Sequence, residues 1–352
     1  MLPTWVGDAC MATPCLRAIR QQFADAHITG IMRPVLWDVI AGSGGCEWFD
    51  DSLFFQKRAC QKHPSRWRIA SILRERRIDT VVLLTNSFWS AAVARLSGAR
   101  RVIGYARDKR SFLLTDAIPV AKIGRSWKPI PAIDYYLGLA RWMGCETLDR
   151  RMCLPVSQED WELHDELYKS IGFASSFPTI VINNNTASHS SRLWPLANVV
   201  ELALQLVQGN DCQVLIHCGP NERQHALRAE AEANHPLVAS MGRCTDLPIG
   251  LSKAVMASAQ VVVTTDSGPR HMAIALNSNV VTLFGSTTPE WTTTYNRPEI
   301  CIQANQGSAV DNFSSSTPVS KMTALGIQDI SVSEVLDSVQ WFLRSTANLS
   351  AA

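Results

Sequence analysis

The sequence has no apolar run that approaches the roughly 20 residues of a membrane-spanning helix. Its apolar runs are short, such as VVLL at 81–84 and VVV at 261–263. The first residues, MLPTWVGD, have neither a basic region nor a long apolar stretch, so they do not resemble a secretory signal. The ten cysteines include no C-x-x-C pair and no zinc-like spacing with histidine. These absences argue against a membrane span and a disulfide framework, and they predict a cytoplasmic protein with reduced thiols.

Several motifs of nucleotide and catalytic chemistry are also missing. No G-x-G-x-x-G follows a strand pattern, and there is neither a Walker loop nor a G-x-S-x-G elbow. FDDS at 49–52 is not a convincing metal-binding Asp-x-Asp. We therefore expect no metal ion and no cofactor. Any anionic leaving group must then be neutralised by basic side chains and a helix N-terminus.

The charge is present but unevenly placed. The net charge is only +2, yet residues 1–156 hold 23 Lys+Arg against 13 Asp+Glu, a net +10, and residues 157–352 hold 10 against 18, a net −8. Two solvated surfaces can differ by chance, but a swing this large favours an anionic partner for the N-terminal half. The basic residues expected to supply this field are Arg66, Arg74, Arg76, Arg77, Arg107, Lys109 and Arg110.

The length suits two domains, and the apolar pattern divides in the same way. Short β-branched runs separated by helical patterns are typical of buried parallel strands in α/β units. One such series ends near Gly144 and a second begins after residue 157. The sequence predicts two Rossmann-like αβα domains, 1–156 and 157–330, that face across a cleft, with a closing helix and tail at 331–352 that packs back. The predicted strands are 27–32, 79–84, 101–104, 179–183, 212–217, 259–265 and 279–285.

The strongest local signal is VVVTTDSGPRHM, residues 261–272. A buried strand ends at Thr265, the turn Asp266-Ser267-Gly268 follows, and His271 lies in the first turn of the next helix. This order places backbone N–H groups at the carboxyl edge of a sheet, where a diphosphate binds well. Asp266 would repel phosphate, so we expect it to cap the helix or to accept hydrogen bonds from sugar hydroxyls. A capped turn without a ligand is the simpler alternative.

Two further loops leave predicted strands of the same domain. NNNTASHSSRLWP, residues 183–195, offers small polar side chains such as Thr186 and a permanent cation, Arg192, that can hold a diphosphate. HCGPNERQ places Glu222 after a strand end, where a carboxylate commonly accepts ribose hydroxyls. Either Arg192 or Glu222 taken alone is equally consistent with an ordinary surface charge.

Four ordered motifs resemble glycosyltransferase family 9, the ADP-heptose:lipopolysaccharide heptosyltransferases, and the heptosyltransferase II branch in particular. They are PTWVGDACMATPCLRAIRQQF, VLLTNSFWSAAVARLSGARRVIGY, SRLWP and TTDSGPRHMAIALNSNVVTLFGSTTPEW. The resemblance implies a GT-B fold with an N-terminal acceptor domain and a C-terminal nucleotide-sugar domain. It also implies a metal-independent, inverting transfer of heptose from ADP-heptose to the anionic inner core of lipopolysaccharide. The enzyme would be peripheral at the inner membrane.

The resemblance also implies residue roles. Asp8 falls on the catalytic base and Arg192 on the residue that binds the donor diphosphate, where the family usually has lysine. The turn residues Asp266, Ser267 and Gly268, with His271, fall on contacts to the sugar and phosphates. Glu222 would meet the ribose and Leu247 would line the adenine pocket, with Thr186 beside the donor. Arg66, Arg107 and Lys109 are the acceptor-binding candidates.

Some alternatives stay open at this stage. Members of the family normally carry an apolar first strand before the Gly-Asp loop, but only six residues precede Gly7, so we expect a truncated first strand. Asp8 could instead be the N-cap of a helix that begins near Ala9. The protein could use another nucleotide sugar, or bind a sugar nucleotide without catalysis.

Overall fold

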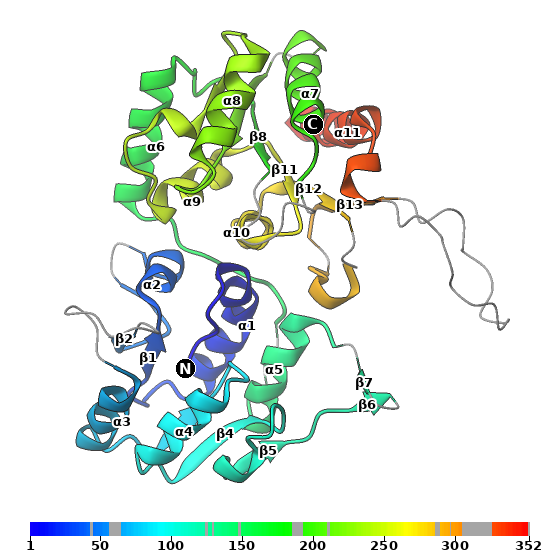
Figure 1. The fold of residues 1–352 in the computed structure, drawn as a ribbon. Helices are drawn as coiled ribbons and strands as arrows, with labels where there is room; N and C mark the ends of the chain where they lie inside the picture. Colours follow the sequence, from blue (N-terminus) through cyan, green and yellow to red (C-terminus); the bar gives the residue numbers. More distant parts are fainter. Residues whose placement is uncertain are drawn as a thin grey trace, which may run out of the picture. The chain divides into compact units, whose positions relative to one another are not determined.

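The computed structural model describes residues 1–42, 45–55, 65–123, 126–128, 130–146, 149–184, 193–209, 212–285, 289–295, 297–304 and 326–350. The chain divides into two compact units (Figure 1). Unit 1 comprises Met1–Ser157 and Glu290–Tyr295, and unit 2 comprises Gln158–Pro289 and Asn296–Ala352.

Unit 2 is built on one parallel sheet with the strand order β10-β9-β8-β11-β12-β13. Every residue of β8, β9, β10 and β11 is buried, as a sheet covered on both faces requires. The strands are β8 (Thr179–Asn183), β9 (Gln213–His217), β10 (Val238–Ser240), β11 (Val261–Thr265), β12 (Asn279–Phe284) and β13 (Glu299–Gln303).

The helices of unit 2 alternate with these strands, which confirms the α/β order predicted after residue 157. The last helix, red in Figure 1, packs against α7 and against β11 and β12. Trp194, buried before α7, donates its indole N–H to the carbonyl oxygen of Ile330 at 3.0 Å and so ties the start of that helix to the unit. The helices are α6 (Gln158–Ile171), α7 (Leu196–Gly209), α8 (Arg223–Ala233), α9 (Ile249–Ser258), α10 (Gly268–Ala275) and α11 (Val332–Ser350), with 3-10 turns η3 (Met241–Arg243) and η5 (Ile327–Asp329).

Unit 1 is also parallel α/β, but its sheet comes in two pieces, β1-β2 and β3-β4-β5. An antiparallel pair, β6 with β7, lies outside both. The strands are β1 (Thr29–Met32), β2 (Asp51–Phe54), β3 (Thr80–Val82), β4 (Arg101–Tyr105), β5 (Asp116–Ile118), β6 (Lys122–Ile123) and β7 (Ser126–Trp127). The helices are α1 (Val6–Gln22), α2 (Pro34–Ile40), α3 (Arg66–Glu75), α4 (Phe88–Leu96) and α5 (Ala132–Trp142), with 3-10 turns η1 (Ser111–Leu113) and η4 (Pro289–Thr292).

The first two residues join the two pieces of this sheet. Leu2 donates its backbone N–H to Ile31 of β1 at 2.9 Å, and Leu84, after β3, donates to the carbonyl of Met1 at 3.1 Å. The terminal ammonium of Met1 donates to the carbonyl of Val82 at 2.7 Å. Burial lowers the pKa of this amine to about 5, because the charged form is poorly solvated there. A two-residue link therefore occupies the position of a central strand.

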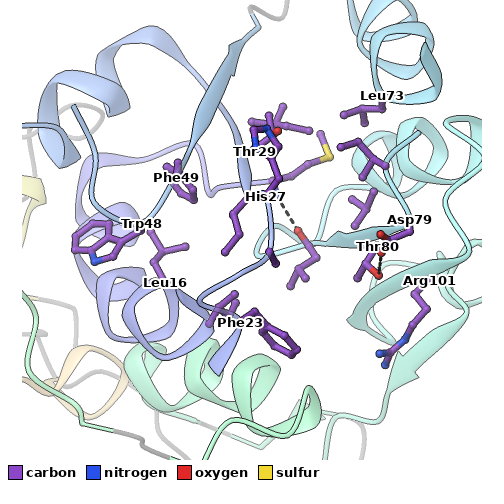
Figure 2. A pocket seen from close by; sticks show the side chains of 18 of the residues that line it. Leu16, Phe23, His27, Thr29, Trp48, Phe49, Leu73, Asp79, Thr80 and Arg101 are labelled. Atoms are coloured by element: carbon purple, nitrogen blue, oxygen red, sulfur yellow. Dashed lines mark hydrogen bonds between the residues drawn. The ribbon is translucent and has the colours of Figure 1, made fainter. Parts of the chain in front are cut away.

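A cavity of about 480 Å³ lies beside this link. Figure 2 shows its lining, which includes Leu16 of α1, Thr29 of β1 and Leu73 of α3. Most of the lining is apolar, and the hydroxyl of Thr29 has no hydrogen-bond partner among the described residues. The gap between β1 and β3 is thus incompletely packed along its length.

Helix α1 runs through Pro14, a residue that normally breaks a helix. Proline cannot donate to the carbonyl four residues earlier, Cys10, and the hydroxyl of Thr13 donates to that carbonyl at 2.7 Å instead. The middle of the helix, residues 9–16, is buried on all sides, with Cys10 and Cys15 fully covered, and α5 is its main neighbour. This substitution of donors keeps α1 continuous from its first turn, where Asp8 lies.

Candidate active site

Asp8 lies in the first turn of α1, which begins at Val6 with Trp5 as the N-cap. The loop and N-cap interpretations of Asp8 are therefore both wrong, since the helix starts three residues earlier than predicted. Burial raises the pKa of the Asp8 carboxyl above its usual value, and a hydrogen bond from Tyr136 opposes part of that rise. The Tyr136 hydroxyl of α5 donates to Asp8 Oδ1 at 3.2 Å. The carboxylate is thus a stronger base than a solvated aspartate.

A second tyrosine of α5 holds the loop that follows β3. Tyr135 donates its hydroxyl to Asn86 Oδ1 at 3.0 Å, and its ring stacks on Tyr105 with 3.9 Å between centroids. Arg110, fully buried, donates to Asn86 Oδ1 at 3.0 Å and to the carbonyls of Thr85 and Tyr105. The contacts of Asn86, Tyr105 and Tyr135 join separate helices and strands, so the sequence pattern does not predict them.

The predicted basic field is smaller on the surface than the count suggests. Arg110 is fully buried, so the prediction that it faces an acceptor is wrong. Arg74 donates to the carbonyl of Leu96, and Arg76 pairs with Asp51. Lys109 is exposed and Arg107 is half-buried, whereas Arg66 is the first residue of α3. The assignment of Arg66, Arg107 and Lys109 to acceptor binding stays a prediction.

In unit 2 the turn after β11 lies at the carboxyl edge of the sheet. Ser267 is the N-cap of α10, and Gly268 and Pro269 form its first positions. Proline is favoured there because the missing N–H needs no partner in the first turn. Asp266 does not cap this helix, which leaves the other predicted role, acceptance from sugar hydroxyls, as the one still open. The N-terminal end of α10 offers its first backbone donor and the positive end of its dipole to an anion.

Asp266 is held by a buried arginine. Arg270 Nη1 donates to Asp266 Oδ1 at 3.0 Å, and Arg270 also makes two bonds to Glu299 of β13, at 2.6 and 3.1 Å. Burial alone would lower the pKa of Arg270, but Glu299 and Asp266 raise it overall. This ion-pair group was not predicted from the sequence. Its signal is a charged residue, Arg270, that precedes the apolar segment MAIA in the same helix.

A polar chain runs through the core to the same turn. His217 Nδ1 contacts Asn183 Oδ1 at 2.9 Å and Nε2 contacts Ser252 Oγ at 2.9 Å. Asn183 Nδ2 donates to Thr264 Oγ1 and to Ser267 Oγ at 2.8 and 3.3 Å, so its Oδ1 must accept and His217 Nδ1 carries the proton. Burial lowers the pKa of His217 to about 4, which keeps the ring neutral. Through Asn183, this network holds the hydroxyl of Ser267 in place.

His271 is the predicted donor-site residue that has an unsatisfied buried nitrogen among the described residues. Its ring is buried, and no group among the described residues hydrogen-bonds to Nδ1. Burial lowers its pKa well below the usual value, and the charge of Arg270 adds to this effect. A neutral histidine with a free nitrogen suits a ligand hydroxyl or phosphate oxygen.

A second cavity of about 500 Å³ opens at the neighbouring strand ends of unit 2. It is lined by Glu222, His217, Trp194 and Asn184 among others. Glu222 is the residue before α8 and makes no side-chain capping bond. Leu247, half-buried before α9, is outside this lining. Thr186 and Arg192 lie outside the described residues.

The described part of the chain lacks both a metal-binding cluster and a membrane-spanning helix. It holds no group of three or more His, Cys, Asp or Glu side chains arranged for a metal ion. None of its helices is long and apolar enough to cross a bilayer.

Comparison with solved structures defines the class of fold. A family 9 glycosyltransferase from Veillonella parvula DSM 2008 is similar with a TM-score of 0.79 and 18% identity, over 98% of this chain and 96% of that one. Escherichia coli ADP-heptose lps heptosyltransferase II is similar with a TM-score of 0.77 and 20% identity, over 98% of both chains. The predicted GT-B fold is confirmed.

Sequence comparison then gives the family. The profile of glycosyltransferase family 9 (heptosyltransferase) matches residues 66–322. Lipopolysaccharide heptosyltransferase 2 of Escherichia coli (strain K12) is 26% identical over 299 residues, which is 82% of this chain and 83% of that protein. The chain belongs to glycosyltransferase family 9, as the motifs predicted, and it is a glycosyltransferase.

Proposed function

We propose that the protein transfers a heptose from ADP-heptose to the inner core of lipopolysaccharide, with inversion at the anomeric carbon. The relatives named for lipopolysaccharide heptose transfer support the substrate class. The observation that carries the chemistry is the half-buried carboxylate of Asp8, which has a raised pKa and accepts a hydrogen bond from Tyr136. A base of this kind suits removal of a proton from an acceptor hydroxyl.

In the proposed mechanism, Asp8 accepts the proton of the acceptor hydroxyl as its oxygen attacks the anomeric carbon. The bond from that carbon to the donor phosphate breaks on the opposite face, and ADP leaves. Arg192 and the N-terminal end of α10 stabilise the negative charge that develops on the diphosphate. Nothing in this scheme requires a metal ion.

Unit 2 supplies the donor side of this proposal. Ser267, which accepts a hydrogen bond from Asn183, and His271, whose Nδ1 has no partner among the described residues, are the proposed contacts to oxygens of the sugar and phosphates. Asp266 retains one carboxylate oxygen for sugar hydroxyls while Arg270 holds the other. The cavity at Glu222 has the size and polarity for a ribose and adenine.

The direct test is incubation with a panel of nucleotide sugars and heptose-deficient core acceptors, with products read by mass spectrometry. A heptosylated product formed only from ADP-heptose supports the proposal. Transfer from a different nucleotide sugar alone would replace the donor assignment. ADP binding without transfer from any donor would replace the enzymatic assignment with a binding function.

Calorimetry tests the diphosphate assignment of Arg192. Arg192→Ala should weaken ADP binding by about 1.5–3 kcal/mol, the usual worth of a charge-assisted hydrogen bond. Arg192→Lys is the matched control, because it keeps the charge and should recover most of the affinity. Equal ADP affinity in the wild type and in Arg192→Ala would contradict the role.

A further inference from the structure

Five of the twelve exposed large apolar side chains among the described residues lie in one part of unit 1. Trp67 is 53% exposed, Phe88 41%, Trp89 47%, Leu96 47% and Phe112 73%. Single exposed apolar residues are normal on a protein, but a contiguous group of them marks an interaction site.

These side chains form one continuous surface. The rings of Trp67 and Trp89 meet edge to face with 5.8 Å between centroids, and Phe88 lies 5.9 Å from Trp89 and 6.2 Å from Phe112. Leu96 is two helical turns after Trp89, so it continues the same side of α4. We call Trp67, Phe88, Trp89, Leu96 and Phe112 the aromatic surface. It spans α3, α4 and η1. Helix α4 packs against both α3 and η1, and α3 and α4 lie side by side in Figure 1.

The aromatic surface lies within the most basic stretch of the sequence. Residues 65–112 contain 11 Lys+Arg and only three Asp+Glu. Arg68 follows Trp67 in α3, Arg95 precedes Leu96 in α4, and Lys109 precedes η1; all three are exposed. Cations around exposed tryptophan and phenylalanine are the combination that favours the interface of an anionic bilayer.

We propose that the aromatic surface docks the protein on an anionic lipid bilayer. The tryptophan and phenylalanine rings enter the headgroup boundary, while Arg68, Arg95 and Lys109 lie against lipid phosphates. Arg68 pairs with Glu75 at 3.2 Å, whereas Arg95 and Lys109 have no acidic partner among the described residues. These two cations favour lipid over a protein partner, because an apolar protein interface is depleted of lysine and of unpaired charge. The role of this docking rests on the proposed function, because it brings the protein to the membrane that carries the proposed acceptor. Its measurement needs no transfer reaction.

Flotation with lipid vesicles tests the docking. The wild type should float with vesicles of phosphatidylcholine mixed with phosphatidylglycerol, and much less with phosphatidylcholine alone. The double variant Trp89→Ser with Phe112→Ser should lose about tenfold or more of its vesicle affinity, since each ring removed forfeits the burial of a large apolar side chain. Trp341→Ser is the matched control: Trp341 is 58% exposed on α11 of unit 2, and its loss should leave flotation unchanged.

Folding and activity are followed on the same preparations. The melting temperature and ADP affinity of the double variant should equal those of the wild type; if the double variant unfolds, Phe112→Ser alone is used, because Phe112 is the most exposed ring of the group. Transfer to a soluble core oligosaccharide should be unchanged, while transfer to an acceptor embedded in vesicles should fall. Equal flotation of the wild type and the double variant would overturn the docking proposal, as would wild-type protein that ignores anionic vesicles. If the wild type transfers nothing to the soluble acceptor, the proposed function is contradicted and the docking proposal is not affected.

Discussion

The sheets of the two units differ in continuity. In unit 2 each strand from β10 to β13 has its parallel neighbours, and the candidate donor residues lie along one carboxyl edge. In unit 1 the sheet is divided, and backbone hydrogen bonds of Met1 and Leu2 connect β1 with the end of β3. The difference shows that Asp8 depends less on a sheet edge than on helix packing, because α1 is held against α5 and not by a strand leading into it.

The titratable groups of the two units also differ. Unit 1 keeps one carboxyl, Asp8, whose pKa is raised, next to a tyrosine. Unit 2 buries neutral histidines and the Arg270 ion pairs. Proton transfer needs a group able to change its charge, whereas binding an anion needs fixed donors, so the two environments suit the two proposed roles.

Asp8→Asn should show the largest effect. Asparagine keeps the shape and the hydrogen bond to Tyr136 but cannot accept a proton, so transfer should fall by roughly 10²–10⁴-fold while ADP-heptose still binds. The measurements are initial rate, donor affinity and melting temperature on one preparation. Leu2→Ile, a change near the same helix start without a titratable group, serves as the control for packing. Near-normal turnover in Asp8→Asn would remove the base from the mechanism.

Replacement of buried arginines compares the units directly. Arg270→Met removes the cation that faces the carboxylates of Asp266 and Glu299, which should cost about 3–5 kcal/mol of unfolding free energy. Arg110→Met in unit 1 should cost less, because the described hydrogen-bond partners of Arg110 are neutral oxygens. Chemical denaturation of both variants gives the two values. A larger loss for Arg110→Met would contradict the view that paired charge distinguishes unit 2.

Acidification should act on the two units with opposite sign. His217 has a folded pKa of about 4 against an ordinary value of 6.5, so the unfolded chain takes up its proton first as the pH falls. Stability from His217 is complete above pH 6.5 and is lost towards pH 4, by up to about 3 kcal/mol. Asp8 behaves oppositely, because its raised pKa makes the folded state bind the proton more tightly.

Hydrogen exchange resolved by unit measures this difference. Between pH 7 and pH 4.5 the protection of β8 and β9 should fall more than that of α1 and α5. His217→Gln should reduce the pH dependence of unit 2 and leave the part that His271 contributes through its own lowered pKa, whereas replacing the exposed His27 by Gln should change neither. Parallel loss in both units would show that His217 is not the controlling group.

The strands of unit 2 could be predicted because their sequences are unambiguous. TIVIN and VVVTT are buried β-branched runs, and β8 and β11 lie at or within two residues of the predicted bounds. The N-cap of α3 is a serine, the residue type favoured there, and the Ser65 side chain accepts from the N–H of Arg68 at 3.3 Å. Short strands such as β5 and β6 were missed, since two or three residues carry too little pattern.

The sequence named candidate site residues but did not predict their environment, and their roles stay predictions. Gly7 suggested a loop because glycine disfavours a helix, yet packing of α1 overrides that preference. Tyr136 lies 128 residues from Asp8, and Glu299 lies 29 residues from Arg270. Such pairings follow from tertiary packing, which periodicity along one chain does not encode.

The smallest expected effect concerns the charge difference between the units. Steering of an anionic acceptor by the net +10 of residues 1–156 is screened as the Debye length shrinks from ~10 Å at 0.1 M salt to ~3 Å at 1 M. The KM for a soluble anionic core acceptor should therefore rise several-fold with salt, and donor affinity should change less. Lys109→Gln should raise the low-salt KM and reduce its salt dependence. Lys169→Gln, an exposed lysine of α6 in unit 2, is the matched control and should change neither. Because the screened interaction is between exposed charges, the effect of one lysine is modest, and only the contrast between the two variants assigns the steering to unit 1. A KM that does not respond to salt would show that the charge difference between the two parts of the chain does not steer the acceptor.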